Sequence, residues 1–256
     1  MFKLLHLSDL HLKPPGVVLH GLHPDLQLQR CVSHILAEHA DADLCIVSGD
    51  IAHDGEPLAY REARGQLKRL PMPVHVMIGN HDDRAALGAE FPEACAADGF
   101  IHRVIETVVG RMVLLDTQDP GSAEGRLCEA RLAWLRARLA ENDQAPVYLF
   151  AHHPPVPVGL QRMDAIRLRD AEAFMAALLP FRDRLRHLFF GHLHRAISGT
   201  WRDLPFSGVR GTSHQIALDF TTPDIAPVSF ETPGYGVALI GADSIVVHHA
   251  DFMASR

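Results

Sequence analysis

Five short polar motifs hold most of the side chains in this sequence that could carry out chemistry. Each motif follows an apolar run that predicts a buried strand, and α/β enzymes place their chemistry at such strand ends. In the first motif the two side chains are two positions apart, so they point to the same side of an extended strand end. The motifs are Asp9-x-His11, Gly49-Asp50, Gly79-Asn80-His81-Asp82, His152-His153 and Gly191-His192-x-His194.

Carboxylate, carboxamide and imidazole groups make up this set, and no thiolate belongs to it. Hard oxygen and imidazole ligands suit a site for Mn²⁺, Fe, Zn²⁺ or Co²⁺. They do not suit a structural zinc site, which is built from cysteines. Seven ligands are too many for one ion, but they fit two ions that share a bridging carboxylate. Such a pair holds both the attacking and the leaving oxygen in phosphoryl transfer. Any one of these histidines could instead be an ordinary polar residue near a sheet edge.

The elements that must position the first three motifs alternate along the chain. Phe2 to Leu7, Leu44 to Val47 and Val74 to Ile78 are strand candidates. A helix that Asp25 can cap is expected to run to about Ala40, and another is expected from about Pro57 to Leu70. This β-α-β-α-β order favours parallel strands with right-handed crossovers.

Later elements follow the same logic. A hairpin is expected over 100–116, helices over 84–90, 127–139 and 171–179, and strands over 147–151 and 188–190. The last part of the chain has short alternating segments broken by Gly, Pro, Thr and Asp, which predicts a second sheet of mostly antiparallel strands packed on the first. These segments are Val228 to Phe230, Val237 to Ile240 and Ile245 to His248.

No repeat or linker divides the chain, so we expect a single domain over residues 1–256. The expected fold class is α/β, with two packed mixed β-sheets flanked by helices. The ligand motifs lie within residues 2–196, and residues 197–256 form a β-rich part.

Composition limits the classes of function. The chain has 256 residues, 18 histidines and a formal net charge of −7, so a nucleic-acid polymer is not an expected partner. No apolar run approaches the roughly 18 residues of a membrane span, and His6 interrupts any signal-peptide pattern. Four separated cysteines are expected to stay reduced, which favours the cytoplasm. The oligomeric state is open, a homo-oligomer included.

In their order and context the motifs resemble those of the calcineurin-like metallophosphoesterase superfamily, over roughly residues 2 to 196. Three stretches are similar to the class III cyclic-nucleotide phosphodiesterases and the related bacterial glycerophosphodiesterases. These are Gly79-Asn80-His81-Asp82-Asp83-Arg84, His152-His153-Pro154-Pro155 and Ser213-His214-Gln215.

The resemblance implies a role for each ligand. One metal ion would be held by Asp9, His11, Asp50 and His194. The other would be held by Asp50 as the bridge, Asn80, His152 and His192. A solvent hydroxide between the ions would attack phosphorus, and His81 would stabilise the transition-state charge or protonate the leaving alkoxide.

Three further residues are candidates for substrate contact. His153 is expected to be either a neighbour of the ligands or a substrate contact. Arg84 could contact phosphate from the start of its helix, or it could pair with Asp82 or Asp83. His214 is expected to shape the substrate side, against an alternative of ordinary sheet-edge polarity.

The loop after the first motif is expected to carry solvated histidines, since Pro14-Pro15-Gly16 opens it. His20 and His23 are the two residues concerned. Substrate contact is the less favoured alternative for both.

Two departures from better-known relatives are informative. Purple acid phosphatases carry a tyrosine ligand three residues after the bridging aspartate, where this chain has His53. Serine/threonine protein phosphatases carry an arginine shortly after the Gly-Asp pair, and residues 51–56 of this chain contain none. Because that arginine helps to hold a monoester dianion, its absence favours a singly charged diester.

These features together predict a binuclear-metal-dependent phosphodiesterase that acts on small phosphodiesters, with 3′,5′-cyclic nucleotides of the cAMP type first among them. Glycerophosphodiesters, 2′,3′-cyclic nucleotides and phosphomonoesters remain open on the same site. A nuclease is less favoured, because it would need a basic groove and this chain is acidic. The alternative from a different class is a non-catalytic metal-binding scaffold. The sequence leaves the metal pair open among Mn, Fe, Zn and Co.

Overall fold

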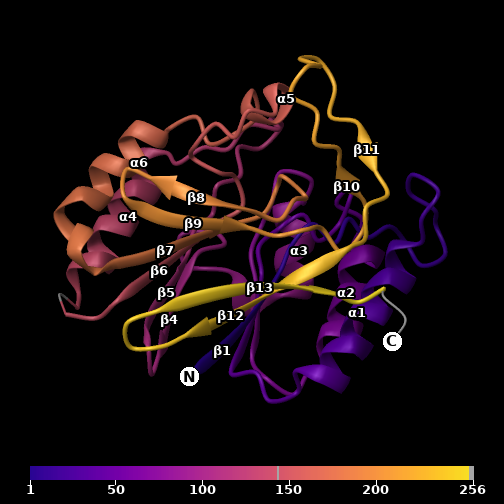
Figure 1. The fold of residues 1–256 in the computed structure, drawn as a ribbon, viewed down its shortest axis with the longest axis horizontal. Helices are drawn as coiled ribbons and strands as arrows, with labels where there is room; N and C mark the ends of the chain where they lie inside the picture. The colour runs from indigo at the N-terminus through magenta and orange to yellow at the C-terminus, as the bar shows by residue number, and fades with distance from the viewer. Residues whose placement is uncertain (143, 254–256) are drawn as a thin grey trace.

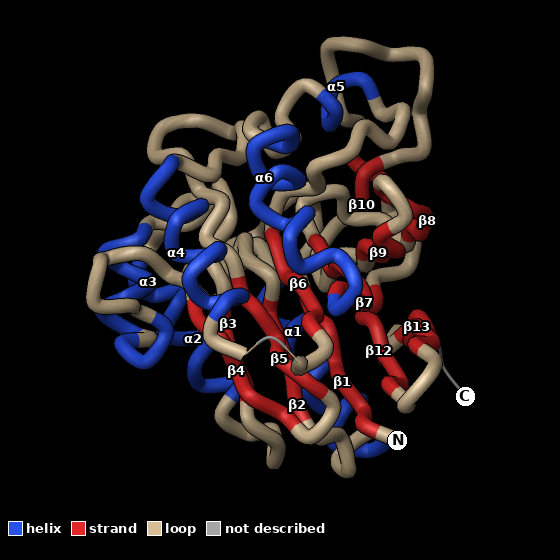
Figure 2. The backbone as a smooth tube through the Cα atoms, turned by 90° about the vertical axis from the view of Figure 1, so that its left-hand side faces the viewer, coloured by secondary structure: helices blue, strands red, loops and turns tan. Residues whose placement is uncertain are grey.

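The computed structural model describes residues 1–142 and 144–253. Two β-sheets pack against each other, and helices cover the outer face of each (Figures 1 and 2). The strands of the first sheet, in spatial order, are β13 (Ile245–Asp251), β12 (Gly234–Ile240), β1 (Phe2–Leu7), β2 (Leu44–Val47) and β3 (Val74–Val76).

The second sheet comes from the middle of the chain. In spatial order its strands are β4 (Arg103–Thr107), β5 (Gly110–Leu114), β6 (Val147–Ala151), β7 (Leu185–Phe190), β9 (Leu204–Gly208) and β8 (Ile197–Trp201). Each sheet contains parallel and antiparallel pairs. The expected fold class, α/β with two packed mixed sheets flanked by helices, is confirmed.

Helices form the outer layers. The first sheet is covered by α1 (Pro24–Glu38), α2 (Pro57–Leu67) and α3 (Arg84–Glu90). The second is covered by α4 (Glu129–Ala140) and α6 (Ala171–Leu178). Short elements occupy the connections: α5 (Gln161–Asp164), the 3₁₀ turns η1 (Pro92–Ala94) and η2 (Leu179–Arg184), and a ribbon of β10 (Gln215–Ile216) and β11 (Val228–Ser229).

Alternation along the strands builds the layers, because successive side chains of a strand point to opposite faces. In β1, Leu5 and Leu7 belong to the core that packs under α1 and α2. Phe2 and Leu4 belong to the core between the sheets. His6 follows the same alternation, and its ring lies edge-on against two phenylalanines of the second sheet.

The expected origin of the second sheet is wrong. β12 and β13 extend the first sheet, because β12 pairs antiparallel with β1 along its length. The third expected segment, 228–230, joins neither large sheet; its strand β11 pairs with β10 in a two-stranded ribbon. Alternation predicts that a segment is a strand and says nothing about which sheet edge it joins. Residues 254–256 of the expected β-rich part lie outside the described residues.

The start of α1 also differs from the expectation. His23 occupies the N-cap and Pro24 the first turn, where its missing N–H is harmless. The Asp25 carboxylate accepts a hydrogen bond from the Gly16 backbone N–H at 2.9 Å and so holds the preceding loop.

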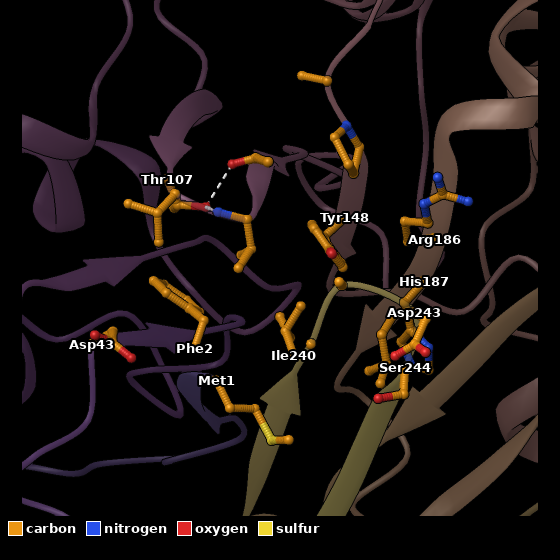
Figure 3. A pocket seen from close by; sticks show the side chains of 18 of the residues that line it. Met1, Phe2, Asp43, Thr107, Tyr148, Arg186, His187, Ile240, Asp243 and Ser244 are labelled. Atoms are coloured by element: carbon orange, nitrogen blue, oxygen red, sulfur yellow. Dashed lines mark hydrogen bonds between the residues drawn. The ribbon is translucent and has the colours of Figure 1, made fainter.

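A cavity of about 1090 Å³ lies at the end of the sandwich where β1, β6 and β7 begin. Figure 3 shows Phe2, Tyr148 and Ile240 on its wall, with Arg186 and His187 beside them. None of the five polar motifs lines it. Within the described part of the chain, no helix has the length and apolarity to span a membrane.

Candidate two-metal site

The five motifs meet where the carboxyl ends of strands from both sheets converge. β1, β2 and β3 run parallel in the first sheet, and β6 and β7 run parallel in the second. The two groups join through the His192 backbone N–H, which donates to both carboxylate oxygens of Asp9 at 3.1 Å. Parallel strands therefore deliver all seven predicted ligands to one end of the sandwich.

Strained backbone is concentrated in these residues. L-residues other than glycine rarely adopt positive φ, and the left-handed conformation costs roughly 1–2 kcal/mol each. Turning the chain this way directs side chains back across the strand ends. Five of the seven ligands adopt it, with φ of 54° at Asp9, 44° at His11, 51° at Asp50, 66° at His192 and 50° at His194.

Two glycines allow the strand ends to approach closely. Gly49 has φ of +105°, and a Cβ there would lie 2.7 Å from Nδ1 of His152. A Cβ on Gly79 would collide with the Asp50 carboxylate. Both glycines thus make room for ligand side chains, as the Gly-Asp and Gly-Asn motifs suggest.

The first ligand cluster consists of Asp9, His11, Asp50 and His194, whose ligand atoms lie within 4.8 Å of one another. Nδ1 of His194 lies 2.8 Å from the His214 carbonyl oxygen, so it carries the proton, and the Nε2 lone pair points inward. That Nε2 lies 3.0 Å from Nε2 of His11 and 3.5 Å from the Asp9 carboxylate. Lone pairs and carboxylate oxygens that converge in this way fit a cation.

The second predicted ligand cluster is Asp50, Asn80, His152 and His192. Nδ1 of His152 donates to the Ser48 carbonyl at 2.8 Å. Its Nε2 lies 3.3 Å from the Asp50 carboxylate and 3.2 Å from the Asn80 amide oxygen. Nε2 of His192 is buried without a hydrogen-bond partner. An acceptor-rich space next to an unpaired buried nitrogen fits a second cation.

Electrostatics in the metal-free chain support the same assignment. Burial lowers the pKa of His152, but the Asp50 carboxylate outweighs it and raises that pKa to about 9. Burial raises the pKa of Asp50, but His152, His81 and His11 hold it well below its usual range. The Asp50 carboxyl therefore favours its ionised form, which is the form that binds a cation. Asp50 is the carboxylate that both clusters share.

His81 lies beside the first cluster without joining either set of ligands. Its backbone N–H donates to Asp50 at 2.9 Å, and its Nδ1 donates to the His53 carbonyl at 2.8 Å. The ring is half-buried, 4.7 Å from the ring of His11. With Nδ1 fixed in this way, Nε2 is the nitrogen left to serve a substrate.

The sequence suggested for Asp82 only a possible ion pair with Arg84, although its place at the end of the Gly-Asn-His-Asp run was a signal. This buried carboxylate accepts from the backbone N–H groups of Ile51, Ala52 and Gly79 at 3.3, 2.9 and 2.9 Å, and from the Tyr60 hydroxyl at 3.1 Å. Burial and the nearby Asp50 raise the pKa of Asp82 to about 6. It holds the Asp50 loop against the Asn80 turn.

Two of the residues considered for substrate contact point elsewhere. The Arg84 guanidinium is held by the buried Asp116 carboxylate, and it also donates to Gln118 at 3.1 Å. It therefore pairs with Asp116 and not with Asp82 or Asp83. His153 has no exposed surface, and its Nδ1 lies 2.8 Å from the Thr117 hydroxyl. Its ring lies 4.7 Å from the His192 ring, so His153 is a buried neighbour of the predicted ligands.

A cluster of non-ligand histidines lies at the open side of the first cluster. The His214 ring lies 4.6 Å from that of His194, and His20 lies 4.8 Å from His214. His53 stacks on His81. His20 is exposed, as expected for a solvated loop residue, although its ring lies beside that of His214. His23 is exposed, as expected.

Comparison with protein families shows a match of residues 2–196 to the model described as calcineurin-like phosphoesterase. A probable cyclic nucleotide phosphodiesterase of Rhodopseudomonas palustris is 41% identical over 98% of this chain and 93% of its own. A probable glycerophosphodiester phosphodiesterase of Arcobacter nitrofigilis is 32% identical over 90% and 85%. The 3′,5′-cyclic adenosine monophosphate phosphodiesterase CpdA of Pseudomonas aeruginosa is 30% identical over 88% and 82%.

Solved structures share the fold. A dimetal phosphatase from Danio rerio superposes with a TM-score of 0.74, at 16% identity, over 98% of this chain and 96% of its own. A purple acid phosphatase from Lupinus luteus gives 0.70 at 12% identity, over 98% of this chain and 51% of its own. At these identities the likeness concerns the fold alone.

Proposed function

Because the chain belongs to the calcineurin-like phosphoesterase family, and is a metal-dependent phosphodiesterase, we propose that its substrates are small phosphodiesters with 3′,5′-cyclic nucleotides first among them. The relatives named above support this proposal, since two of the three carry cyclic-nucleotide names. The third supports the alternative, a glycerophosphodiesterase on the same site. We further propose that the two ions are divalent or trivalent transition metals, drawn from Mn, Fe, Zn and Co, because the ligands are imidazoles and hard oxygens.

The observation that carries the diester assignment is the charge of the site. Among the residues that the structure describes, no arginine donates to any of the seven ligands, and Arg84 is held by Asp116. A phosphomonoester carries nearly two negative charges at neutral pH, and its second charge normally takes a guanidinium fork in addition to metals. A site of two cations held by two carboxylates, imidazoles and one carboxamide, with no guanidinium among its described contacts, suits the single charge of a diester.

The proposed mechanism assigns each protein group a task. When bound, two cations would act as Lewis acids, neutralise phosphate charge and lower the pKa of attacking solvent. Asp50 would contribute to both metal positions, because its carboxylate faces His11 and His152. Asn80 and His192 orient the second cluster, and the His194 ring is fixed by the His214 carbonyl. Nδ1–H of His81 donates to the His53 carbonyl, so Nε2 faces the substrate. In the imidazolium form, protonated on both nitrogens, His81 would give the Nε2 proton to the leaving alkoxide or stabilise charge on phosphorus.

His214 completes the proposal on the substrate side. Its ring lies 5.0 Å from that of His11 and is 6% exposed, so a small ester group bound at the first cluster would meet it. A His214→Ala variant is then expected to raise KM or change preference among diesters, with metal content unchanged. Identical kinetics across several diesters would favour ordinary sheet-edge polarity.

A non-catalytic scaffold is the weaker candidate, because every ligand and His81 are present in the chain. All four cysteines are free thiols in the structure, which supports the proposed cytoplasmic location.

Turnover of a substrate panel with Mn²⁺ supplied tests the proposal. The panel contains 3′,5′- and 2′,3′-cyclic nucleotides, glycerophosphodiesters, and bis(p-nitrophenyl) phosphate beside p-nitrophenyl phosphate. We expect kcat/KM for the diester of this matched pair to exceed that of the monoester at least about tenfold, a difference of roughly 1.4 kcal/mol in transition-state binding. A preference for the monoester would overturn the diester assignment and leave the two-metal site standing. Turnover of no ester would favour a scaffold.

A further inference from the structure

His53 contacts both a ligand of the first cluster and the catalytic candidate His81. Its Nδ1 lies 3.0 Å from Nδ1 of His11. Its backbone carbonyl accepts from Nδ1 of His81 at 2.8 Å, and its ring stacks on the His81 ring at 4.8 Å and 21°. The ring is half-buried, so it is part of the wall of the site.

Hydrogen bonds fix the position of His53 relative to His11. The segments 11–12 and 50–53 lie side by side, with the His11 N–H donating to the Asp50 carbonyl at 2.9 Å. The His53 N–H in turn donates to the Leu12 carbonyl at 2.9 Å. Backbone pairing between the two segments therefore places the His11 and His53 side chains next to each other.

His11 differs from His152 and His194 in the partner of its second nitrogen. His152 and His194 each direct Nδ1 to a backbone carbonyl oxygen, an obligatory acceptor, which leaves Nε2 for the cation. The partner of His11 is a ring nitrogen, which accepts in only one tautomer. For His11 to present its Nε2 lone pair, its Nδ1–H must donate to Nδ1 of His53. His53 must then carry its own proton on Nε2, facing the open side.

We propose that His53 is a positioning residue that fixes His11 through its ring and His81 through its carbonyl. This inference rests on the proposed two-metal function and adds a residue to it. The ring of His53 selects the metal-binding tautomer of His11, so it sets the affinity of the first cluster. Its carbonyl fixes the orientation of the His81 ring at the same time. One residue therefore sets the positions of both a metal ligand and the proton donor.

Two substitutions separate the ring from the carbonyl. His53→Phe keeps an aromatic ring to stack on His81 and keeps the backbone carbonyl, but it removes the acceptor for His11. His53→Asn restores an acceptor through its amide oxygen. His23→Phe is the matched control, because His23 is an exposed histidine whose side chain makes no cap hydrogen bond to α1.

Calorimetric titration of the metal-free variants with Mn²⁺ measures affinity without any substrate. We expect His53→Phe to weaken one of two binding steps about 10–100-fold, the usual effect of losing the partner of a ligand histidine, and to leave the other step unchanged. His53→Asn should recover most of the loss, and His23→Phe should match the unsubstituted chain. Anomalous diffraction at limiting Mn²⁺ should show the weakened ion at the cluster that contains His11.

Nitrogen-15 NMR of the Zn²⁺-loaded chain provides a test that needs no variant. It should find His11 protonated on Nδ1 and His53 protonated on Nε2. The opposite tautomer of His53 would overturn the proposal. So would wild-type metal affinity in His53→Phe, or equal losses in His53→Phe and His53→Asn. If the substrate panel fails while these metal and NMR results hold, the proposed function is wrong and the role of His53 stands.

Discussion

Asp50 is the residue on which both ligand clusters depend. Its carboxylate lies 3.5 Å from Nε2 of His11 and 3.3 Å from Nε2 of His152, so one side chain faces both metal positions. Asp50→Ala should therefore release both ions and abolish turnover. Asp41→Ala is a matched control, since it removes an exposed carboxylate of equal charge that pairs with Lys3 away from the site. Metal analysis after desalting checks the result, and retention of two ions in Asp50→Ala would contradict the bridging role.

His81 should act on the leaving group and not on metal. His81→Ala is expected to keep both ions, because neither cluster uses its ring, and to lose roughly 10²–10⁴-fold in kcat on alkyl diesters. The loss should shrink for nitrophenyl esters, whose leaving group needs no proton. Parallel kinetics on the two substrate types and metal analysis measure this. Loss of metal from the variant would assign His81 to a ligand cluster instead.

Residues whose roles follow from local spacing could be predicted from the sequence, and residues whose roles follow from contacts between loops could not. The seven predicted ligands could be recognised in the sequence because each lies at or just after the end of an apolar strand, where residue type and spacing carry the signal. The contacts of Asp82 and His53 could not, because they form only when separate loops meet. Arg84 shows the converse, since nothing near it in sequence indicated that Asp116 would hold its guanidinium.

Loops β2–α2 and β3–α3 depend on Asp82 for their mutual position. Asp82→Asn would place an amide N–H₂ among four donors where a carboxylate now accepts. We expect a loss of about 1–3 kcal/mol in the free energy of unfolding, the range for unsatisfied buried polar groups. Tyr60→Phe leaves the three backbone donors to Asp82 in place, but it also removes the hydroxyl that accepts from the Asp83 backbone N–H at 2.7 Å, so it tests the Tyr60 part of the network. Urea denaturation of both variants measures this, and an unchanged midpoint for Asp82→Asn would contradict the assignment.

Strands were more predictable than their partners. The expected bounds of β1, β2 and β6 agree with the structure, because these apolar runs are buried on both faces and end sharply in polar motifs. β12 was equally recognisable as a strand, yet it joins β1 and not a separate sheet. Its pairing is decided by how the chain returns from the second sheet, which no local pattern encodes.

Stability of the whole molecule should fall in mildly acidic solution. His187 is buried beside Ser207, 2.9 Å from its hydroxyl, and burial lowers the pKa of His187 to about 4. The unfolded chain takes up this proton near pH 6.5 and the folded chain only near pH 4, so stability is full above pH 6.5 and falls as the pH drops through this window. At pH 5 this group alone should account for about 2 kcal/mol.

A His187→Gln variant should lose that part of the pH dependence, since glutamine keeps a donor for Ser207 and does not titrate. Urea unfolding at pH 7.5 and pH 5 measures the difference between the two chains. Equal slopes with pH in both would show that His187 is protonated in the folded state as readily as in the unfolded one.

The origin of the ligands in both sheets has a consequence for the life of the protein. Asp9, Asp50 and Asn80 come from one sheet, and His152 and His192 come from the other, so the ions would act as cross-links between two halves of the chain. Such a cross-link stabilises only the folded form and resists the separation of the sheets. Metal starvation should then do more than stop turnover. It should open the ligand end of the sandwich to proteases, so the availability of metal would set the abundance of the enzyme as well as its activity.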